Sequence, residues 1–159
     1  MKNPWDDEPE SVDFEHMGYK CAMRRNSFGA WCGYVAVPDT HALYQKDYSY
    51  RLLLSPADDT KIDEVGVLNA FCSAFKEADG KTELTLLIPC HGGLTFAGTG
   101  TWLEPTGTVW WFGFDCSHSG DRAPDDRLGS YGIYRDESYV RGVIEKMVPV
   151  IDALKKVYE

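Results

Sequence analysis

Two short stretches of the chain hold most of the side chains that could do chemistry. Residues 90–96 read Cys-His-Gly-Gly-Leu-Thr-Phe, and residues 109–121 run from an apolar segment into an acid, a thiol, an imidazole and a second acid. Imidazoles and carboxylates bind divalent metals and transfer protons, and a thiol can act as a nucleophile. Because polar groups at the end of a rigid apolar strand often form sites, we interpret the chain as a scaffold that joins the two stretches.

Two catalytic hypotheses follow from these residue types. In the first, a divalent metal such as zinc supports a hydrolytic site, with the candidate ligands His91, Asp115, His118 and Asp121. In the second, Cys116 or Cys90 is a nucleophile, with a nearby histidine as base and an aspartate that orients it. The catalytic candidates over both hypotheses are His91, Asp115, Cys116 and His118.

A third hypothesis needs neither catalysis nor a cofactor. The same region would bind a small ligand or a protein surface, with aromatic side chains as a platform. Its predicted ligand-binding residues are His91, Gly93, Thr95, Trp111, Asp115, His118 and Asp121. The structural alternative is that the polar residues after the apolar segment only organise a loop through hydrogen bonds to its backbone.

The alternation of side chains predicts which faces these residues occupy. In a strand over 108–116, Trp110, Phe112, Phe114 and Cys116 would face the core, and Trp111, Gly113 and Asp115 would face the other side. If residues 90–97 form a regular neighbouring strand, His91 and Thr95 join that second face. Gly93 and Gly113 would then leave room for a ligand. A bulge beside Gly93 would break this arrangement.

The remaining pattern indicates an α+β fold, with an antiparallel sheet, a long C-terminal helix and a second, shorter helix packed on it. Asp136 is the predicted N-cap of the long helix, which would run to about residue 158. The shorter helix is predicted over 60–79. The predicted strands cover residues 18–25, 31–37, 51–54, 81–88, 90–97 and 108–116.

The first fifteen residues are acidic, which predicts a mobile tail in front of a single domain over 16–159. Such a tail would aid solubility or dock on a basic partner. Its acids are Asp6, Asp7, Glu8, Glu10, Asp13 and Glu15.

Composition limits the function further. A length of 159 residues suits one domain, and a net charge of -9 opposes direct binding to nucleic acid phosphates. The five cysteines form no CxxC pair, which favours free thiols in a reducing cytosol. With no apolar run near about 18 residues, we expect a soluble protein without a membrane partner. The many aromatic residues leave room for a homodimer.

The order of several motifs resembles a family of small uncharacterised bacteriophage and prophage proteins. The shared motifs are GYV-x-VP at 33–38, HGG[LI]T[FY] at 91–96, GFDC-x-H-x-GD at 113–121, and a C-terminal Tyr-Arg and Tyr-Val pair at 134–135 and 139–140. In that family the stretch between residues 48 and 91 is often shorter, so the helix over 60–79 would be an insertion.

The resemblance implies an origin and no mechanism. It places the protein in the cytoplasm of a bacterial host cell, as a phage or prophage accessory protein that acts by binding. The partner would be a small ligand such as a nucleotide signal, or a host or defence protein that it inhibits. The alternative is a small hydrolase that uses a His/Asp metal site or a Cys-His site.

Overall fold

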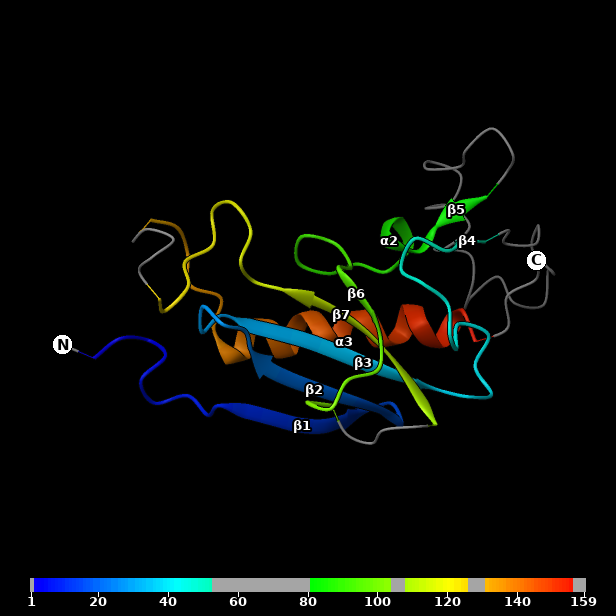
Figure 1. Ribbon diagram of the computed structural model, residues 1–159, viewed down its shortest axis with the longest axis horizontal. Helices are drawn as coiled ribbons and strands as arrows, with labels where there is room; N and C mark the ends of the chain where they lie inside the picture. The colour runs from blue at the N-terminus through cyan, green and yellow to red at the C-terminus, as the bar shows by residue number, and fades with distance from the viewer. Residues whose placement is uncertain (1, 53–80, 104–107, 126–130, 156–159) are drawn as a thin grey trace.

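A computed structural model describes residues 2–52, 81–103, 108–125 and 131–155. Its main sheet has five antiparallel strands in the order β1-β2-β3-β7-β6. Helix α3 lies across one face of this sheet (Figure 1), so the protein is a single α+β domain, as predicted. The strands are β1 (Ser11–His16), β2 (Tyr19–Arg25), β3 (Trp31–Pro38), β6 (Phe96–Gly98) and β7 (Val109–Asp115), and α3 is Glu137–Ala153.

Strand β1 corrects the prediction that residues 1–15 are a mobile tail. It pairs with β2 along its whole length, from Ser11 opposite Arg24 to His16 opposite Tyr19. Val12 and Phe14 pack against the core, while the acids that follow each of them, Asp13 and Glu15, are exposed. Charges on the outer side of an edge strand are normal, because they prevent pairing with other chains. The folded domain therefore includes residues 11–15.

The segment that follows residue 80 also differs from its prediction as a strand over 81–88. Only β5 (Thr82–Glu83) is extended, and it pairs with β4 (Arg51–Leu52). One helical turn, α2 (Leu84–Leu87), comes next. Its helical spacing buries Leu84 and Leu87 and exposes Leu86, whereas a strand would have placed Leu84 and Leu86 on one side. The helix predicted over 60–79 lies outside the described residues.

A turn replaces most of the strand predicted over 90–97. Gly92 and Gly93 have φ angles of 72° and 86°, and the Gly93 amide donates to the Cys90 carbonyl at 3.2 Å. These angles are left-handed and cannot belong to an extended strand. Regular pairing with β7 is limited to the short strand β6.

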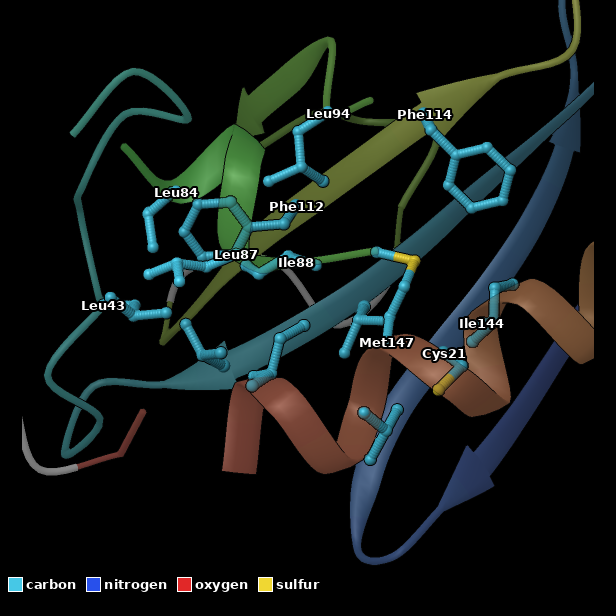
Figure 2. Packing of buried hydrophobic residues seen from close by; sticks show 14 of the residues in the cluster. Cys21, Leu43, Leu84, Leu87, Ile88, Leu94, Phe112, Phe114, Ile144 and Met147 are labelled. Carbon is cyan, nitrogen blue, oxygen red and sulfur yellow. The ribbon is translucent and has the colours of Figure 1, made fainter. Parts of the chain in front are cut away.

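The main core fills the space between the sheet, α2 and α3 (Figure 2). Phe112, Phe114 and Cys116 are buried in it, with Trp110 partly buried at its edge, so the predicted core face of β7 is confirmed. Its other contributors include Leu43, Leu84, Leu87, Ile88, Leu94, Ile144 and Met147.

The opposite face of the sheet carries a second, smaller buried cluster, formed by Ala22, Cys32, Tyr34, Ala36, Leu103 and Trp111. Trp111 is only 1% exposed, which corrects its prediction as a ligand platform. The space beside Gly113 is filled as well, because a Cβ there would lie 2.4 Å from the Tyr34 ring. Its missing side chain makes room for Tyr34 and not for a ligand.

Helix α3 begins as predicted. The Asp136 carboxylate accepts a hydrogen bond from the Tyr139 amide at 2.8 Å and so caps the first turn. The buried stripe of the helix packs on the sheet and consists of Val140, Ile144, Met147, Val148 and Ile151. No helix in the described segments is long and apolar enough to cross a membrane.

Candidate functional site

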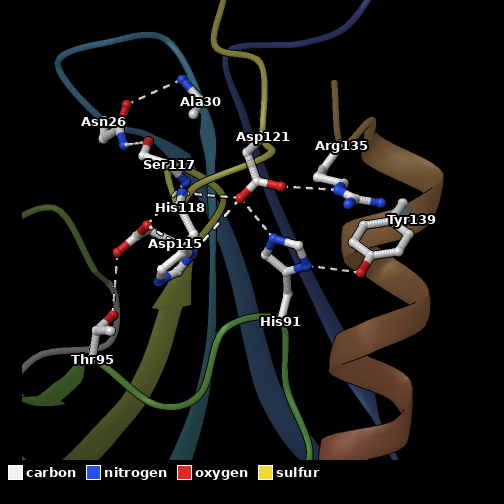
Figure 3. Close-up of polar contacts among 10 residues, drawn as sticks. All are labelled: Asn26, Ala30, His91, Thr95, Asp115, Ser117, His118, Asp121, Arg135 and Tyr139. Carbon is white, nitrogen blue, oxygen red and sulfur yellow. Dashed lines mark hydrogen bonds and ion pairs between the residues drawn. The ribbon is translucent and has the colours of Figure 1, made fainter. Parts of the chain in front are cut away.

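Polar side chains from three parts of the chain meet beyond the end of β7, beside the start of α3 (Figure 3). The first part is the turn over 90–95, the second is the loop that leaves β7, and the third is the first turn of α3 with the residues before it. We call this group the His-Asp site, and its residues are His91, Thr95, Asp115, His118, Asp121, Arg135 and Tyr139.

Asp121 lies at the centre of the His-Asp site, with its side chain only 2% exposed. Its Oδ2 accepts hydrogen bonds from His91 Nε2 at 2.7 Å and from the His118 amide at 3.0 Å, and its Oδ1 accepts one from Arg135 Nε at 3.0 Å. Burial alone would raise the pKa of Asp121, but these hydrogen bonds outweigh burial and lower it. The carboxylate is therefore ionised at neutral pH.

His91 is held at both ring nitrogens. Because Asp121 is an ionised acceptor, the proton in the 2.7 Å contact belongs to His91 Nε2. The other nitrogen, Nδ1, lies 2.9 Å from the Tyr139 hydroxyl, which donates to a neutral ring or accepts from a charged one. The orientation of the imidazole is thus fixed by a carboxylate on one side and a phenol on the other.

His118 lies against the same carboxylate but is bonded differently. Its Nδ1 is buried and has no hydrogen-bond partner among the residues that the structure describes. It lies 3.5 Å from Asp115 Oδ1 and 3.7 Å from Asp121 Oδ2, between two acidic oxygens. The ring rests on the turn at Gly92, where a Cβ would lie 2.4 Å from its Cε1 atom. Glycine at position 92 therefore makes room for the imidazole.

Asp115 connects the site to the rim of the sheet. Its Oδ1 accepts a hydrogen bond from the Ser117 amide at 3.0 Å, which turns the chain away from β7. Its Oδ2 accepts one from the Thr95 hydroxyl at 3.3 Å. About a third of the Asp115 and His118 side chains is exposed, at 31% and 32%, so solvent reaches the site from this side.

The structure brings together five of the predicted ligand-binding residues, and not by the route predicted. They do not share one face of two regular strands, because the Gly92-Gly93 turn carries His91 toward α3 and the loop after β7 carries His118 and Asp121 to meet it. These five are His91, Thr95, Asp115, His118 and Asp121. Gly93 borders the site, and a Cβ there would meet no atom within 4 Å.

Sequence reasoning missed two members of the site, Arg135 and Tyr139. Tyr139 lies in the first turn of α3, is 38% exposed, and contacts His91. Both residues flank the N-cap Asp136. Their place at the start of a capped helix was the available signal, since helix starts often border sites.

The two cysteines of the nucleophile hypothesis have unsuitable surroundings. Cys116 is 1% exposed, and burial raises its pKa far above the ordinary value for a thiol. Burial also raises the pKa of Cys90 to about 12. Burial favours the thiol form of both sulfurs at neutral pH, which disfavours a Cys-His site.

Three of the four predicted metal ligands lie close to one another. Nitrogen and oxygen atoms of His91, His118 and Asp121 all fall within 4.8 Å of each other, the one such group found in the described part of the chain. The fourth candidate, Asp115, borders this group through His118. The residue types suit a borderline cation such as Zn²⁺.

Comparison of the chain with protein-family models, curated proteins and solved structures finds no match.

Proposed function

We propose that the protein acts by binding a small polar ligand at the His-Asp site. The observation that carries this proposal is the buried Nδ1 of His118, which lies between two carboxylates and makes no hydrogen bond to any of the described residues. Leaving a buried polar atom without a partner costs roughly 1–3 kcal/mol, so such atoms call for an explanation. A ligand that supplies the missing partner would recover this free energy.

Loop organisation alone does not account for the site. It explains the backbone bonds that Asp115 and Asp121 accept from Ser117 and His118. It does not explain why His91, from a separate turn, is fixed at both nitrogens, nor why His118 Nδ1 is left without a partner.

The motif resemblance supports a role as a phage or prophage accessory protein in the cytoplasm of a bacterial host. His91 and Gly92 belong to the HGG motif, and Asp115, His118 and Asp121 belong to the GFDC-x-H-x-GD motif. Polar residues from two of the shared motifs thus meet at the site. This role implies a ligand such as a nucleotide signal of the host or of its defence system. The alternative is that the protein binds a host or defence protein.

A small hydrolase is the second candidate, favoured by the pairing of His91 with Asp121. A buried carboxylate 2.7 Å from an imidazole nitrogen orients the ring, as an aspartate does for the histidine base of a catalytic triad. The version of this hypothesis that uses a cysteine is not retained.

Ligand-induced thermal stabilisation tests the proposal. The full chain is heated with a panel of nucleotides and phosphorylated metabolites, alongside His118→Ala and a control, His16→Ala, whose residue ends β1 away from the site. A ligand at about 100 times its Kd adds roughly 2.7 kcal/mol of stability. We expect one compound class to raise the Tm of the wild type and the control but not of His118→Ala. An equal rise in all three proteins contradicts the proposal, and turnover of the compound selects the hydrolase.

A further inference from the structure

We propose that His91 Nε2, His118 Nδ1 and Asp121 Oδ2 form a three-ligand site for a divalent cation of the Zn²⁺ class. The fourth position would be left for a hydroxyl oxygen of the ligand or for water. This inference deepens the proposed function, on which its choice of ligand group rests, while the cation site itself stands on the geometry alone.

The distances around His118 fit a tetrahedral cation. With Zn–N and Zn–O bonds of about 2.0–2.1 Å, two ligand atoms of a tetrahedral site lie about 3.3–3.4 Å apart. His118 Nδ1 is 3.7 Å from Asp121 Oδ2, and it makes no hydrogen bond that a cation would have to break. In the tautomer with its proton on Nε2, His118 would present the Nδ1 lone pair to a cation shared with Asp121.

His91 needs one local change to join the shell. At 2.7 Å, its Nε2 and Asp121 Oδ2 share a proton, and a cation replaces that proton while the two atoms move about 0.6 Å apart. A neutral ring changes tautomer in this step: the Nε2 proton leaves to solvent, Nδ1 takes up a proton, and the Tyr139 hydroxyl, 2.9 Å away, turns from donor to acceptor. This is the tautomer that a histidine bound through Nε2 requires.

Each proposed ligand has a neighbour that fixes its orientation. Tyr139 holds His91, Arg135 bonds the other oxygen of Asp121 at 3.0 Å, and the backbone at Gly92 packs on the ring of His118. Such supporting contacts are typical of metal sites and usually matter for affinity. The charges also agree, because the two aspartates outnumber Arg135 and leave the site negative without a cation.

The open position faces Asp115. The Asp121 and His91 side chains are deep, at 2% and 13% exposed, whereas the Asp115 and His118 side chains are about one-third exposed. An oxygen that enters from this side would meet the cation and Asp115 together. Since a carboxylate accepts hydrogen bonds, it favours an oxygen that carries a proton, which is a hydroxyl or water.

Titration of the metal-free full chain with Zn²⁺, followed by calorimetry, tests the cation site without any organic ligand. We expect one site per chain, at least a 100-fold weaker Kd in His91→Ala and in His118→Ala, and an unchanged Kd in His16→Ala. Asp121→Asn, which preserves the shape of the side chain, serves as a further variant should an alanine variant have a lowered Tm.

Titration with Co²⁺ reports the ligand types. A tetrahedral site of nitrogen and oxygen donors gives a strong visible spectrum without the near-ultraviolet band of a thiolate ligand. No binding by the wild type, equal binding by His118→Ala, or a thiolate band overturns the cation site. If a compound stabilises the protein through His118 in the absence of metal, the proposed ligand binding is supported even when the cation site is refuted. If the protein binds the cation but no compound stabilises it, the proposed ligand binding is refuted and the cation site is supported.

Discussion

Gly92 lies directly beneath the imidazole of His118, where a Cβ would come within 2.4 Å of Cε1 and 2.6 Å of Nδ1. This contact joins the two motifs of the chain. His91 and His118 can both lie beside Asp121 only because the turn at Gly92 leaves room for the His118 ring. The neighbouring glycine has no such role, since a Cβ at Gly93 would meet no atom within 4 Å.

The glycine pair offers a matched test of the site. Both residues have left-handed φ angles, of 72° and 86°, so an alanine at either costs roughly 1–2 kcal/mol of folding free energy. Only Gly92→Ala also displaces the His118 ring. We expect urea unfolding to show similar losses of stability in the two variants. Binding of the cation and of the ligand should be weaker by roughly tenfold or more in Gly92→Ala alone.

Nuclear magnetic resonance provides the structural readout for the same pair. The Cε1–H signal of His118 should shift in Gly92→Ala and stay in place in Gly93→Ala. Equal effects on binding for the two variants would mean that the turn conformation, and not the room it leaves for His118, governs the site.

Glu8 anchors the N-terminal segment to the start of α3. Its Oε2 accepts a hydrogen bond from the Glu137 amide at 2.6 Å, and its Oε1 bonds the Tyr134 hydroxyl and lies 3.4 Å from Arg25 Nη2. Burial alone would raise the pKa of Glu8, but these hydrogen bonds lower it, so the carboxylate is ionised in the folded protein.

We therefore expect Glu8→Ala to lower the free energy of unfolding by roughly 2–3 kcal/mol, because its charged hydrogen bonds are largely buried. Glu10→Ala, which removes an exposed acid two residues away, should change it by no more than about 0.5 kcal/mol. Urea unfolding of the two variants and the wild type measures the difference. If Glu8→Ala is as stable as Glu10→Ala, the first ten residues are the loose tail that their acidity suggests.

The buried position of His41 leads us to expect a loss of stability in mild acid. It is 6% exposed, its Nδ1 accepts a hydrogen bond from the Leu43 amide at 3.0 Å, and its Nε2 donates to the Ile151 carbonyl at 2.9 Å. Burial lowers its pKa below the ordinary value of 6.5. A proton on Nδ1 would break the bond to Leu43.

The direction of the pH dependence of stability follows from the lowered pKa of His41. The unfolded chain binds the proton first as the pH falls through 6.5, so the contribution of His41 is present above that pH and is lost as the pH falls toward the lower folded pKa. We expect the free energy of unfolding to fall between pH 7.5 and 5.5, and to fall less in His41→Gln. The same pH slope in both proteins would assign the effect to other groups.

The thiol at the end of β7 should be inert. Since Cys116 is 1% exposed with a raised pKa, iodoacetamide should label it only after unfolding, and Cys116→Ala should bind cation and ligand like the wild type. Peptide mapping of alkylated native and unfolded protein measures the first, and calorimetry the second. Rapid labelling of Cys116 in the folded protein would restore the nucleophile hypothesis.

Local patterns predicted the parts of the fold that local physics determines. Alternating apolar and charged residues identify β2, and continuous apolar runs identify β3 and β7. Asp136 marks the start of α3 because an N-cap acts within one turn. The residue types of the site were also recognisable, because imidazoles and carboxylates grouped at the end of an apolar strand are suited to binding and proton transfer.

What failed depends on contacts far along the chain. β1 alternates apolar and acidic residues, and its acids suggested a mobile tail. Its strand conformation depends on pairing with β2, which the acidic segment alone does not reveal. Trp111 is covered by a cluster that includes Leu103, which its own strand does not specify. The partners of His91 were hidden by the turn at Gly92 and Gly93, which redirects its side chain from the sheet face to α3.

The most direct test of the central claim is native mass spectrometry of the full chain purified from bacterial cells, beside His118→Ala and His16→Ala. The account predicts that the wild type and His16→Ala retain an added mass, from a divalent cation with or without a small molecule, and that His118→Ala is recovered without it. Three proteins of bare polypeptide mass, or the same added mass on all three, would contradict a ligand site built around His118.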